Sequence, residues 1–389
     1  MEPLELRHIG GKRYARYGYG IDEVALVPSL STVDPEDIDL SVDVLFPDGK
    51  PLFPGEMPLF ASAMDSAVGP QFCGVAHRFG VRAVLNLQGL FTRYEEPEEA
   101  LRRIREAPRE RATRVIQEVY QAPIQEKWIR ARIREIRETE APVYVSLTPA
   151  LVEKYLPILQ EEGVDALFVQ STVTSPRHRS QWGPVLDLKS VTERVSFPVV
   201  VGNCVTYEVA YALMEAGAAA ILVGVGPGAA CTTRQVTGVG VPQITATADC
   251  AMARDEFYRR TGRYVPIITD GGMRTGGDIA KVLCAGADFV MLGSVFAKAE
   301  ESPGRGYHWG MATADPNLPR GTRVFVGGPY PLGVILHGPS DASDGSLNLL
   351  GALKSAMGLV GAQNLRELQQ AELIIAPSVQ MEGKFYQYG

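Results

Sequence analysis

Short apolar runs alternate with longer amphipathic stretches along most of this chain. Eight of these runs are almost entirely apolar, which is typical of strands buried on both faces of a parallel sheet. They span residues 59–62, 81–86, 143–147, 166–170, 199–203, 220–224, 266–270 and 288–292. The stretches that follow them predict helices, for example at residues 150–162, 206–217, 244–261 and 277–287. Eight successive strand–helix units favour a (β/α)8 TIM barrel, with a Rossmann-type sheet as the alternative.

Two regions interrupt this repeat. Residues 95–140, after the second strand, are charged and helix-prone, with Pro108 and Pro123 as breakers, which predicts a helical insert of two or three helices. Residues 295–345, after the eighth strand, are rich in Gly and Pro and predict an irregular flap over the barrel mouth, because long loops in compact domains are usually functional. Residues 347–357 then predict the helix that closes the barrel. We therefore expect residues 1–389 to form a single barrel domain.

The loop after the sixth strand carries a candidate nucleophile. Three alternating glycines, Gly224, Gly226 and Gly228, precede Cys231 and Thr233. Glycines let the backbone adopt positive φ and turn its amides or carbonyls inward. A thiolate is a strong nucleophile, and its pKa falls near amide dipoles or cations. The pattern indicates a nucleophile loop, and an ordinary strand-to-helix turn with a buried cysteine is the alternative.

Glycine turns also follow the seventh and eighth strands. They contain Asp270-Gly271-Gly272 and Gly293-Ser294. In a (β/α)8 barrel these two loops commonly form a phosphate site, because glycine amides and a helix N-terminus converge there on an anion. We therefore expect a phosphate-bearing substrate. The carboxylate of Asp270 could accept a hydrogen bond from a ribose hydroxyl, or it could cap the following helix.

Composition narrows the function classes. The formal net charge of -7 argues against nucleic-acid binding, which normally needs a basic face. No apolar run reaches the ~18 residues of a membrane span, and the first residues lack the apolar stretch of a signal peptide, so we expect a cytoplasmic protein. The five cysteines show no CxxC spacing, which argues against a zinc site or a disulfide framework. The GxGxxG fingerprint is not met after any strand, so a nicotinamide cofactor must bind in another way.

Taken in chain order, these motifs resemble the IMP dehydrogenase and GMP reductase family. Cys231, with its glycines, Thr233 and residues 238–243, resembles the catalytic loop of that family. Residues 270–272 and 286–294 resemble the segments that bind ribose and phosphate in that family. Residues 22–28 resemble its N-terminal signature, residues 62–65 its first barrel loop and residues 350–357 its last helix. The matches run from about Gly20 to Gly383 and so cover nearly the whole chain. The family fold is a (β/α)8 barrel, in agreement with the strand pattern.

The resemblance implies covalent catalysis on a purine mononucleotide. In the dehydrogenase, the thiolate of Cys231 would add to C2 of IMP, a hydride would pass to NAD+, and the adduct would be hydrolysed to XMP. In the reductase, the same cysteine would displace ammonia from GMP, and NADPH would deliver a hydride to give IMP. Thr233 would orient the water in the first reaction and assist the ammonia step in the second. Both routes divide one difficult step into two easier ones.

The resemblance also implies roles for other residues. The phosphate is expected on Gly271, Gly272, Gly293 and Ser294. The ribose diol is expected on Asp270, and the purine base on backbone groups of Gly310 and Met311. Ser62 and Met64, in the first barrel loop, are also expected to bind the substrate. The nicotinamide is expected near Gln170, Ser171, Asn203 and Gly224.

The chain departs from the family pattern in several places. The regulatory pair of CBS modules that most IMP dehydrogenases carry is missing, which suggests a family branch without them. Ala229 stands where a phosphate-binding serine is usual, and Gln170 where the dehydrogenases commonly carry an aspartate. The flap lacks the Arg-Tyr pair whose arginine activates water, and Arg320 replaces the usual glutamate. We therefore hypothesise that Arg320 acts with Thr233 on the water, with Arg323 as its neighbouring candidate. Alternatively, both arginines merely pair with a phosphate or a carboxylate.

Two resemblances favour the dehydrogenase over the reductase. Residues 238–245 resemble the bacterial dehydrogenases, and residues 379–383 resemble a segment that completes a potassium site between subunits. That site would join Glu382 and Gly383 to the carbonyls of Gly226, Gly228 and Cys231, which implies bound K+ and a homo-oligomer, either a tetramer or an octamer. The missing Arg-Tyr pair and CBS insert are reductase-like, yet the glutamate of the reductase is absent too. GMP reductase therefore remains the alternative, followed by a nucleotide-binding protein without turnover.

Overall fold

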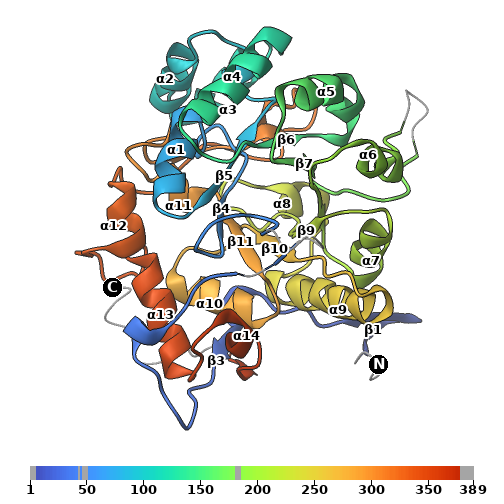
Figure 1. Ribbon diagram of the computed structural model, residues 1–389, viewed down its shortest axis with the longest axis vertical. Helices are drawn as coiled ribbons and strands as arrows, with labels where there is room; N and C mark the ends of the chain where they lie inside the picture. The colour runs from blue at the N-terminus through green and yellow to red at the C-terminus, as the bar shows by residue number, and fades with distance from the viewer. Residues whose placement is uncertain (1–5, 43, 46–50, 180–184, 377–389) are drawn as a thin grey trace.

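A closed parallel barrel forms the centre of the molecule. The computed structural model describes residues 6–42, 44–45, 51–179 and 185–376. In order of hydrogen bonding around the barrel the strands are β10-β11-β4-β5-β6-β7-β8-β9 (Figure 1). Their bounds are β4 (Leu59–Ala61), β5 (Arg82–Asn86), β6 (Tyr144–Leu147), β7 (Ala166–Gln170), β8 (Val199–Cys204), β9 (Ala220–Val223), β10 (Ile267–Asp270) and β11 (Phe289–Leu292). The eight strands expected from sequence are confirmed to within one residue at each end, and the Rossmann-type alternative is wrong.

Helices surround the barrel because each buries an apolar stripe against the strands. The outer ring contains α1 (Pro70–Arg78), α5 (Pro149–Glu162), α6 (Leu188–Arg194), α7 (Tyr207–Glu215), α9 (Gln243–Thr261), α10 (Gly276–Cys284) and α13 (Leu349–Leu359). The helices predicted at residues 150–162, 206–217, 244–261 and 277–287 are present as α5, α7, α9 and α10, and the predicted closing helix is α13. Side chains such as Leu213 and Leu353 are fully buried between helices and strands. Burying such a side chain stabilises the fold by roughly 1.5–3 kcal/mol, so this ring dominates the apolar core.

The interior of the barrel is filled with aromatic rings. They are contributed by Phe53, Phe60, Tyr144, Phe168 and Phe289. Arg82, at the start of β5, closes the end where the strands begin. Its guanidinium donates to the carbonyls of Phe53 and Gly55 and lies 5.0 Å from the centroid of the Phe289 ring. Because the interior is solid, a ligand can enter only at the opposite end, where the strands finish.

The insert after the second barrel strand contains the helices α2 (Glu98–Glu106), α3 (Ala112–Val119) and α4 (Glu126–Glu138). Isoleucine and valine side chains such as Ile104, Ile116 and Val119 are buried, while exposed arginines such as Arg102 and Arg114 pair with glutamates. Figure 1 shows the three helices packed together at one end of the view. This insert has the number of helices that the charge and proline pattern predicts.

The segment after β11 is more regular than the sequence predicts. It contains α11 (Ser294–Ala297), β12 (Tyr307–His308), the 3-10 turn η5 (Met311–Ala314), β13 (Val324–Phe325) and α12 (Leu332–His337). Strands β12 and β13 pair in an antiparallel ribbon. Several hydrogen bonds join the insert to this segment. Arg105 donates to the carbonyl of Pro303, Gln117 donates to that of Asp315, and Arg323 donates to that of Ile104.

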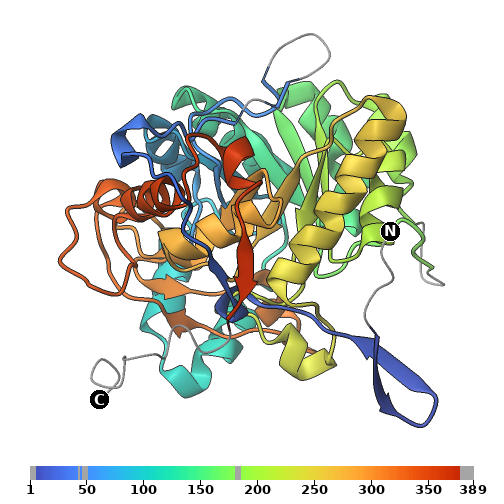
Figure 2. The same cartoon turned by 90° about the horizontal axis from the view of Figure 1, so that it is seen from below.

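The hydrophobic pattern predicts no element before residue 59. The first described residues nevertheless form a hairpin of β1 (Leu6–Gly10) and β2 (Arg13–Arg16), which projects away from the barrel (Figure 2). Farther along, β3 (Val24–Leu26) pairs with β14 (Leu373–Ile375), so segments from the two ends of the described chain lie side by side. Short exposed strands of this kind lack a long apolar run, which explains why periodicity alone did not find them.

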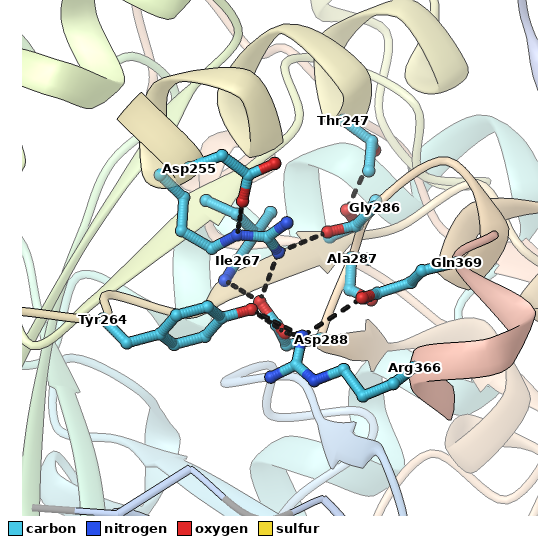
Figure 3. Close-up of polar contacts among 11 residues, drawn as sticks. Thr247, Asp255, Tyr264, Ile267, Gly286, Ala287, Asp288, Arg366 and Gln369 are labelled. Atoms are coloured by element: carbon cyan, nitrogen blue, oxygen red, sulfur yellow. Dashed lines mark hydrogen bonds and ion pairs between the residues drawn. The ribbon is translucent and has the colours of Figure 1, made fainter. Parts of the chain in front are cut away.

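A buried carboxylate organises the end of the barrel opposite the pocket (Figure 3). Asp288, just before β11, accepts hydrogen bonds from Arg254, from the hydroxyl of Tyr264, from the amide of Ile267 and from Arg366. The side chains of Arg254 and Asp288 are 5% and 1% exposed. These contacts tie α9 and α14 (Leu365–Leu368) to the start of two barrel strands. A buried ion pair of this kind is sensitive to the loss of one partner.

We therefore expect Asp288→Ala to lower the free energy of unfolding by about 3–5 kcal/mol, because the buried guanidinium of Arg254 then keeps only the exposed Asp255 as a counter-ion. Glu99→Ala is the matched control, because the Arg102–Glu99 pair is exposed and should leave stability nearly unchanged. Urea unfolding followed by circular dichroism measures both variants. Equal destabilisation by the two substitutions would contradict a special role for the buried pair.

Candidate active site at the barrel mouth

A pocket of about 780 Å³ opens where the barrel strands end. It is bounded by loops from most of the barrel strands and by the segment after β11. Eighteen of the site residues expected from sequence line this one pocket: Ser62, Met64, Gln170, Ser171, Asn203, Gly224, Gly226, Gly228, Cys231, Thr233, Asp270, Gly271, Gly272, Gly293, Ser294, Gly310, Met311 and Arg320. The other two, Glu382 and Gly383, lie outside the described residues.

The glycine-rich loop after β9 places Cys231 at the pocket. Gly224 and Gly226 have φ values of +143° and +76°, in the region that favours glycine. A Cβ on Gly224 would lie 2.5 Å from the carbonyl oxygen of Asp270, so the loop also needs glycine for space. The thiol of Cys231 donates to Oγ1 of Thr233 at 3.1 Å. The two side chains therefore lie close enough to act on one reacting centre.

Cys231 differs from the other cysteines in its exposure. It is half-buried, whereas Cys73, Cys204, Cys250 and Cys284 are buried. Burial raises the pKa of Cys73 to about 12 and that of Cys284 to about 11. A hydrogen bond with Cys204, together with burial, raises the pKa of Cys250. Reactivity requires an accessible thiolate, so Cys231 is the cysteine suited to nucleophilic chemistry.

Backbone pairing attaches the segment after β11 to the nucleophile loop. The amide of Thr322 donates to the carbonyl of Ala230 at 3.0 Å, and the amide of Thr232 donates to the carbonyl of Arg320 at 3.2 Å. Arg320 therefore lies beside Cys231 and lines the pocket. Within the described part of the chain, its Nε atom is buried without a hydrogen-bond partner. An unpaired buried donor at this place is available to a ligand or a water molecule.

Arg323 lies elsewhere. Its guanidinium donates to the carbonyls of Ile104 and Arg105 and stacks 4.6 Å from the ring centroid of Tyr307. It is not among the residues that line the pocket. The prediction that Arg323 could act on water is wrong, because its guanidinium is hydrogen-bonded to the insert and does not line the pocket.

Asp270 lies at the end of β10 with two amide donors on one oxygen. Its Oδ2 accepts from Nδ2 of Asn203 at 2.9 Å and from Nε2 of Gln170 at 3.1 Å. Burial raises the pKa of Asp270 to about 6, against the lowering effect of these two hydrogen bonds. Thr275, not Asp270, caps α10, so the capping alternative is wrong. The sequence analysis placed Gln170 and Asn203 near a cofactor and did not foresee that both hold this carboxylate.

The two glycines after Asp270 form a tight turn against the nucleophile loop. Gly271 and Gly272 have φ values of +82° and +88°. A Cβ on either would lie within 3.3 Å of the ring of Pro227. The backbone can therefore approach a ligand here only while both positions remain glycine.

Several residues that line the pocket were not predicted from the sequence. They include Asn86, Ser146, Thr148, His308 and Asp315. Asn86 was detectable, because it is the last residue of the expected second strand and barrel sites lie just past strand ends. His308 and Asp315 lie on an irregular segment whose path over the mouth no periodicity reveals.

The described residues contain no helix long and apolar enough to cross a membrane. Within the same ranges, no cluster of three or more His, Cys, Asp or Glu side chains could hold a metal ion. The carbonyl site expected for potassium is a different kind of site. In it, the carbonyl of Gly228 already accepts from the amide of Cys231 at 3.0 Å.

Comparison with known proteins places these features in context. Residues 18–312 match the family described as IMP dehydrogenase / GMP reductase domain. An uncharacterized oxidoreductase of Mycobacterium tuberculosis is 35% identical over 376 residues, which cover 94% of this chain and 99% of that protein. The inosine-5'-monophosphate dehydrogenase of Haemophilus influenzae is 38% identical over 57% of this chain and 47% of its own length. The crystal structure of an IMP dehydrogenase/GMP reductase-like protein from Corynebacterium glutamicum superposes with a TM-score of 0.88 at 32% identity, covering 95% of this chain and 97% of that one.

The exposure pattern generates one chemical prediction. Iodoacetamide should alkylate Cys231 much faster than the four buried cysteines in the folded protein, because Cys231 is the one cysteine of the five that is not buried. Peptide mass spectrometry after short exposures locates the modified residue. Cys231→Ala should remove the fast phase, whereas the buried-site control Cys284→Ala should keep it. Fast alkylation at Cys73 or Cys250 would contradict this assignment.

Proposed function

The chain belongs to the IMP dehydrogenase/GMP reductase family of oxidoreductases, and we propose that it oxidises IMP to XMP with NAD+ through a covalent adduct on Cys231. The observation that carries the proposal is the Cys231–Thr233 pair, 3.1 Å apart, in one pocket with Asp270 and the glycine turn that follows it. Covalent chemistry on a purine mononucleotide needs a nucleophile for the base, a hydrogen-bond acceptor for the ribose hydroxyls and a backbone turn for the phosphate.

The side chains support a consistent sequence of steps. Sγ of Cys231 forms a bond to C2 of the hypoxanthine ring, and the hydrogen at C2 leaves as a hydride. NAD+ held beside C2 would supply the acceptor for that hydride, which carries the two electrons of the C2–H bond. Water then adds to C2, the C2–S bond breaks, and the thiol is restored as XMP leaves. Thr233 is placed to orient that water, because its hydroxyl already contacts the sulfur.

The pocket is large enough to support the proposal of a nicotinamide beside the nucleotide. Ser171 and Gly224 line the same pocket as Cys231, and Asn203 donates to Asp270. A volume of about 780 Å³ lies within the range of sites that take cofactor-sized ligands. We propose that these residues and Gln170 hold the nicotinamide end of NAD+, or of NADPH in the alternative reaction.

Hydrolysis needs a group that takes a proton from water. We propose that Arg320 serves with Thr233, because Arg320 lines the pocket and has a buried Nε atom without a partner in the described chain. A guanidinium is a poor proton acceptor, so burial and alignment with the water would have to supply the difference.

GMP reductase activity is the second candidate. It is favoured by the flap segment, whose residues 320–322 pair with the nucleophile loop. These residues include neither a carboxylate nor an Arg-Tyr pair that could activate water for hydrolysis. The same Cys231–Thr233 pair would serve loss of ammonia from GMP. A nucleotide-binding protein without turnover is the third candidate, which the intact pair disfavours.

We also propose a cytoplasmic homo-oligomer, either a tetramer or an octamer, in which potassium binds the carbonyls of Gly226, Gly228 and Cys231. Glu382 and Gly383 of a neighbouring subunit would complete that site. These proposals rest on the family resemblance of the two segments.

Two parallel assays test the function. IMP with NAD+ and potassium should produce absorbance of the reduced nicotinamide, whereas GMP with NADPH should leave that absorbance unchanged. Cys231→Ala should abolish turnover while the dissociation constant for IMP changes less than about threefold, because phosphate and ribose contacts lie on other loops. Loss of NADPH absorbance with GMP would establish the reductase instead. Activity retained by Cys231→Ala would remove the covalent mechanism.

Arg320→Gln tests the water step. It should slow hydrolysis far more than hydride transfer, by about 10²-fold or more, as expected for loss of a general base. Rapid mixing should then show a burst of NADH while adduct accumulates on Cys231, detected by protein mass spectrometry. Arg323→Gln is the matched control and should show no burst, because that arginine is bonded to the insert. A parallel fall of hydride transfer and turnover in Arg320→Gln would exclude it as the base.

A further inference from the structure

Three carboxamide side chains surround Asp270, the last residue of β10. Gln170 ends β7 and Asn203 lies in β8, and both donate to Oδ2 of Asp270, at 3.1 Å and 2.9 Å. Gln243, the first residue of α9, holds the main chain instead. Its Nε2 donates to the carbonyl of Asp270 at 3.0 Å and to that of Val223 at 3.1 Å. Neutral donors therefore fix both the backbone and one carboxylate oxygen of Asp270.

The other carboxylate oxygen of Asp270 is unpaired and accessible. Within the described ranges, Oδ1 accepts no hydrogen bond, and it is not one of the buried polar atoms that lack a partner. Asp270 lines the pocket, so Oδ1 is the oxygen that a ligand can reach. A carboxylate oxygen has two lone pairs, so Oδ1 can accept from both hydroxyls of a ribose.

The donors that hold Oδ2 leave the charge of the carboxylate available. Burial raises the pKa of Asp270 to about 6, and the hydrogen bonds from Asn203 and Gln170 oppose that rise, so the side chain is an acceptor at neutral pH. Asp270 has no ion pair in the described part of the chain, since Arg274 pairs with Asp22 and Asp278 instead. Hydrogen bonds to a charged acceptor are roughly twice as strong as those between neutral groups.

Backbone pairing brings the two amide side chains to the same oxygen. The amide of Ser171 donates to the carbonyl of Gly202 at 3.0 Å, and the amide of Asn203 donates to the carbonyl of Ser171 at 3.1 Å. This exchange joins the end of β7 to β8 just after Gln170. Gly224, which follows β9, has no side chain, and a Cβ there would lie 2.8 Å from the Nε2 atom that holds the main chain.

We propose that Gln170 is a positioning residue for ribose recognition: with Asn203 it turns Asp270 so that Oδ1 faces the 2′- and 3′-hydroxyls of the ligand. The inference rests on the proposed function only in taking the ligand to be a ribose phosphate. Gln170 acts through the carboxylate and does not touch the hydroxyls. Its loss should therefore weaken binding of ribose more than binding of deoxyribose, which has one hydroxyl fewer to align.

Calorimetry without nicotinamide tests the proposal with ribose 5-phosphate against 2-deoxyribose 5-phosphate, and with IMP against 2′-deoxy-IMP. The measured quantity is the ribose preference, the Kd of the deoxy probe divided by that of its ribose partner. In the wild-type protein this preference should be about tenfold or more, as expected for a hydrogen bond to a charged group. Gln170→Leu should lower it to about threefold, because Asn203 alone then holds Oδ2.

Two further variants sharpen the test. Gln170→Glu keeps the shape of the side chain, but its ionised oxygens cannot donate and would repel Asp270, so the ribose preference should vanish. Gln160→Leu is the matched control, because the exposed Gln160 donates to the carbonyl of Arg194 and does not line the pocket. It should keep the full preference.

The outcomes separate this inference from the proposed function. No ribose preference in the wild-type protein overturns the role of Gln170 even if neither variant at this position folds. An unchanged preference in a folded Gln170→Leu overturns it as well, and so does an equal loss of affinity for both sugars, which would mark a merely structural role.

If Gln170→Leu loses the preference but the wild-type protein turns over neither IMP nor GMP, the role of Gln170 stands and the proposed function fails. Turnover of IMP with a ribose preference that does not depend on residue 170 is the opposite result. Failure of all four probes to bind overturns both.

Discussion

The pocket depends on backbone pairing between the nucleophile loop and the segment that returns over the barrel mouth. Residues 230–232 and 320–322 exchange hydrogen bonds through main-chain atoms, and Cys231 lies opposite Gly321. A Cβ on Gly321 would lie 2.9 Å from the carbonyl of Ala230, so this approach needs a glycine. Because the pairing uses no side chain, residue 320 can change chemically without moving the loop. That freedom explains how an arginine can occupy position 320 while the loop keeps its pairing.

The helical insert supplies the support behind that segment. Tyr120, at the end of α3, donates to Asp65 and accepts from the indole of Trp309, so the first barrel loop, the insert and the segment after β11 meet at one buried hydroxyl. Arg323 adds a second attachment to α2. Its Nη1 donates to the carbonyls of Ile104 and Arg105, which is a structural use of an arginine that the sequence pattern placed near the chemistry.

The sequence could predict the barrel because its strands are short apolar runs buried on both faces, a pattern that needs no tertiary information. It could also predict the glycine loops, since barrel chemistry concentrates at strand ends. It could not predict the shared contact of Gln170 and Asn203 with Asp270, because the three residues lie on different strands and their side-chain directions depend on the packed barrel. The place of His308 depends likewise on the path of an irregular segment. Residues after 376 lie outside the described chain, so the potassium segment stays a prediction.

Electrostatics link these residues into one argument about binding. Burial disfavours charge on two groups that line the pocket: it raises the pKa of Asp270 to about 6 and lowers that of His308 to about 4. Under the proposed function, the ribose hydroxyls of a mononucleotide would donate to the carboxylate of Asp270 and favour its charged form. The glycine turns after β10 and β11 would take the phosphate through backbone amides. A free nucleobase offers neither group, whereas a phosphorylated nucleoside offers both, which is a physical basis for the proposed selection of that class of ligand.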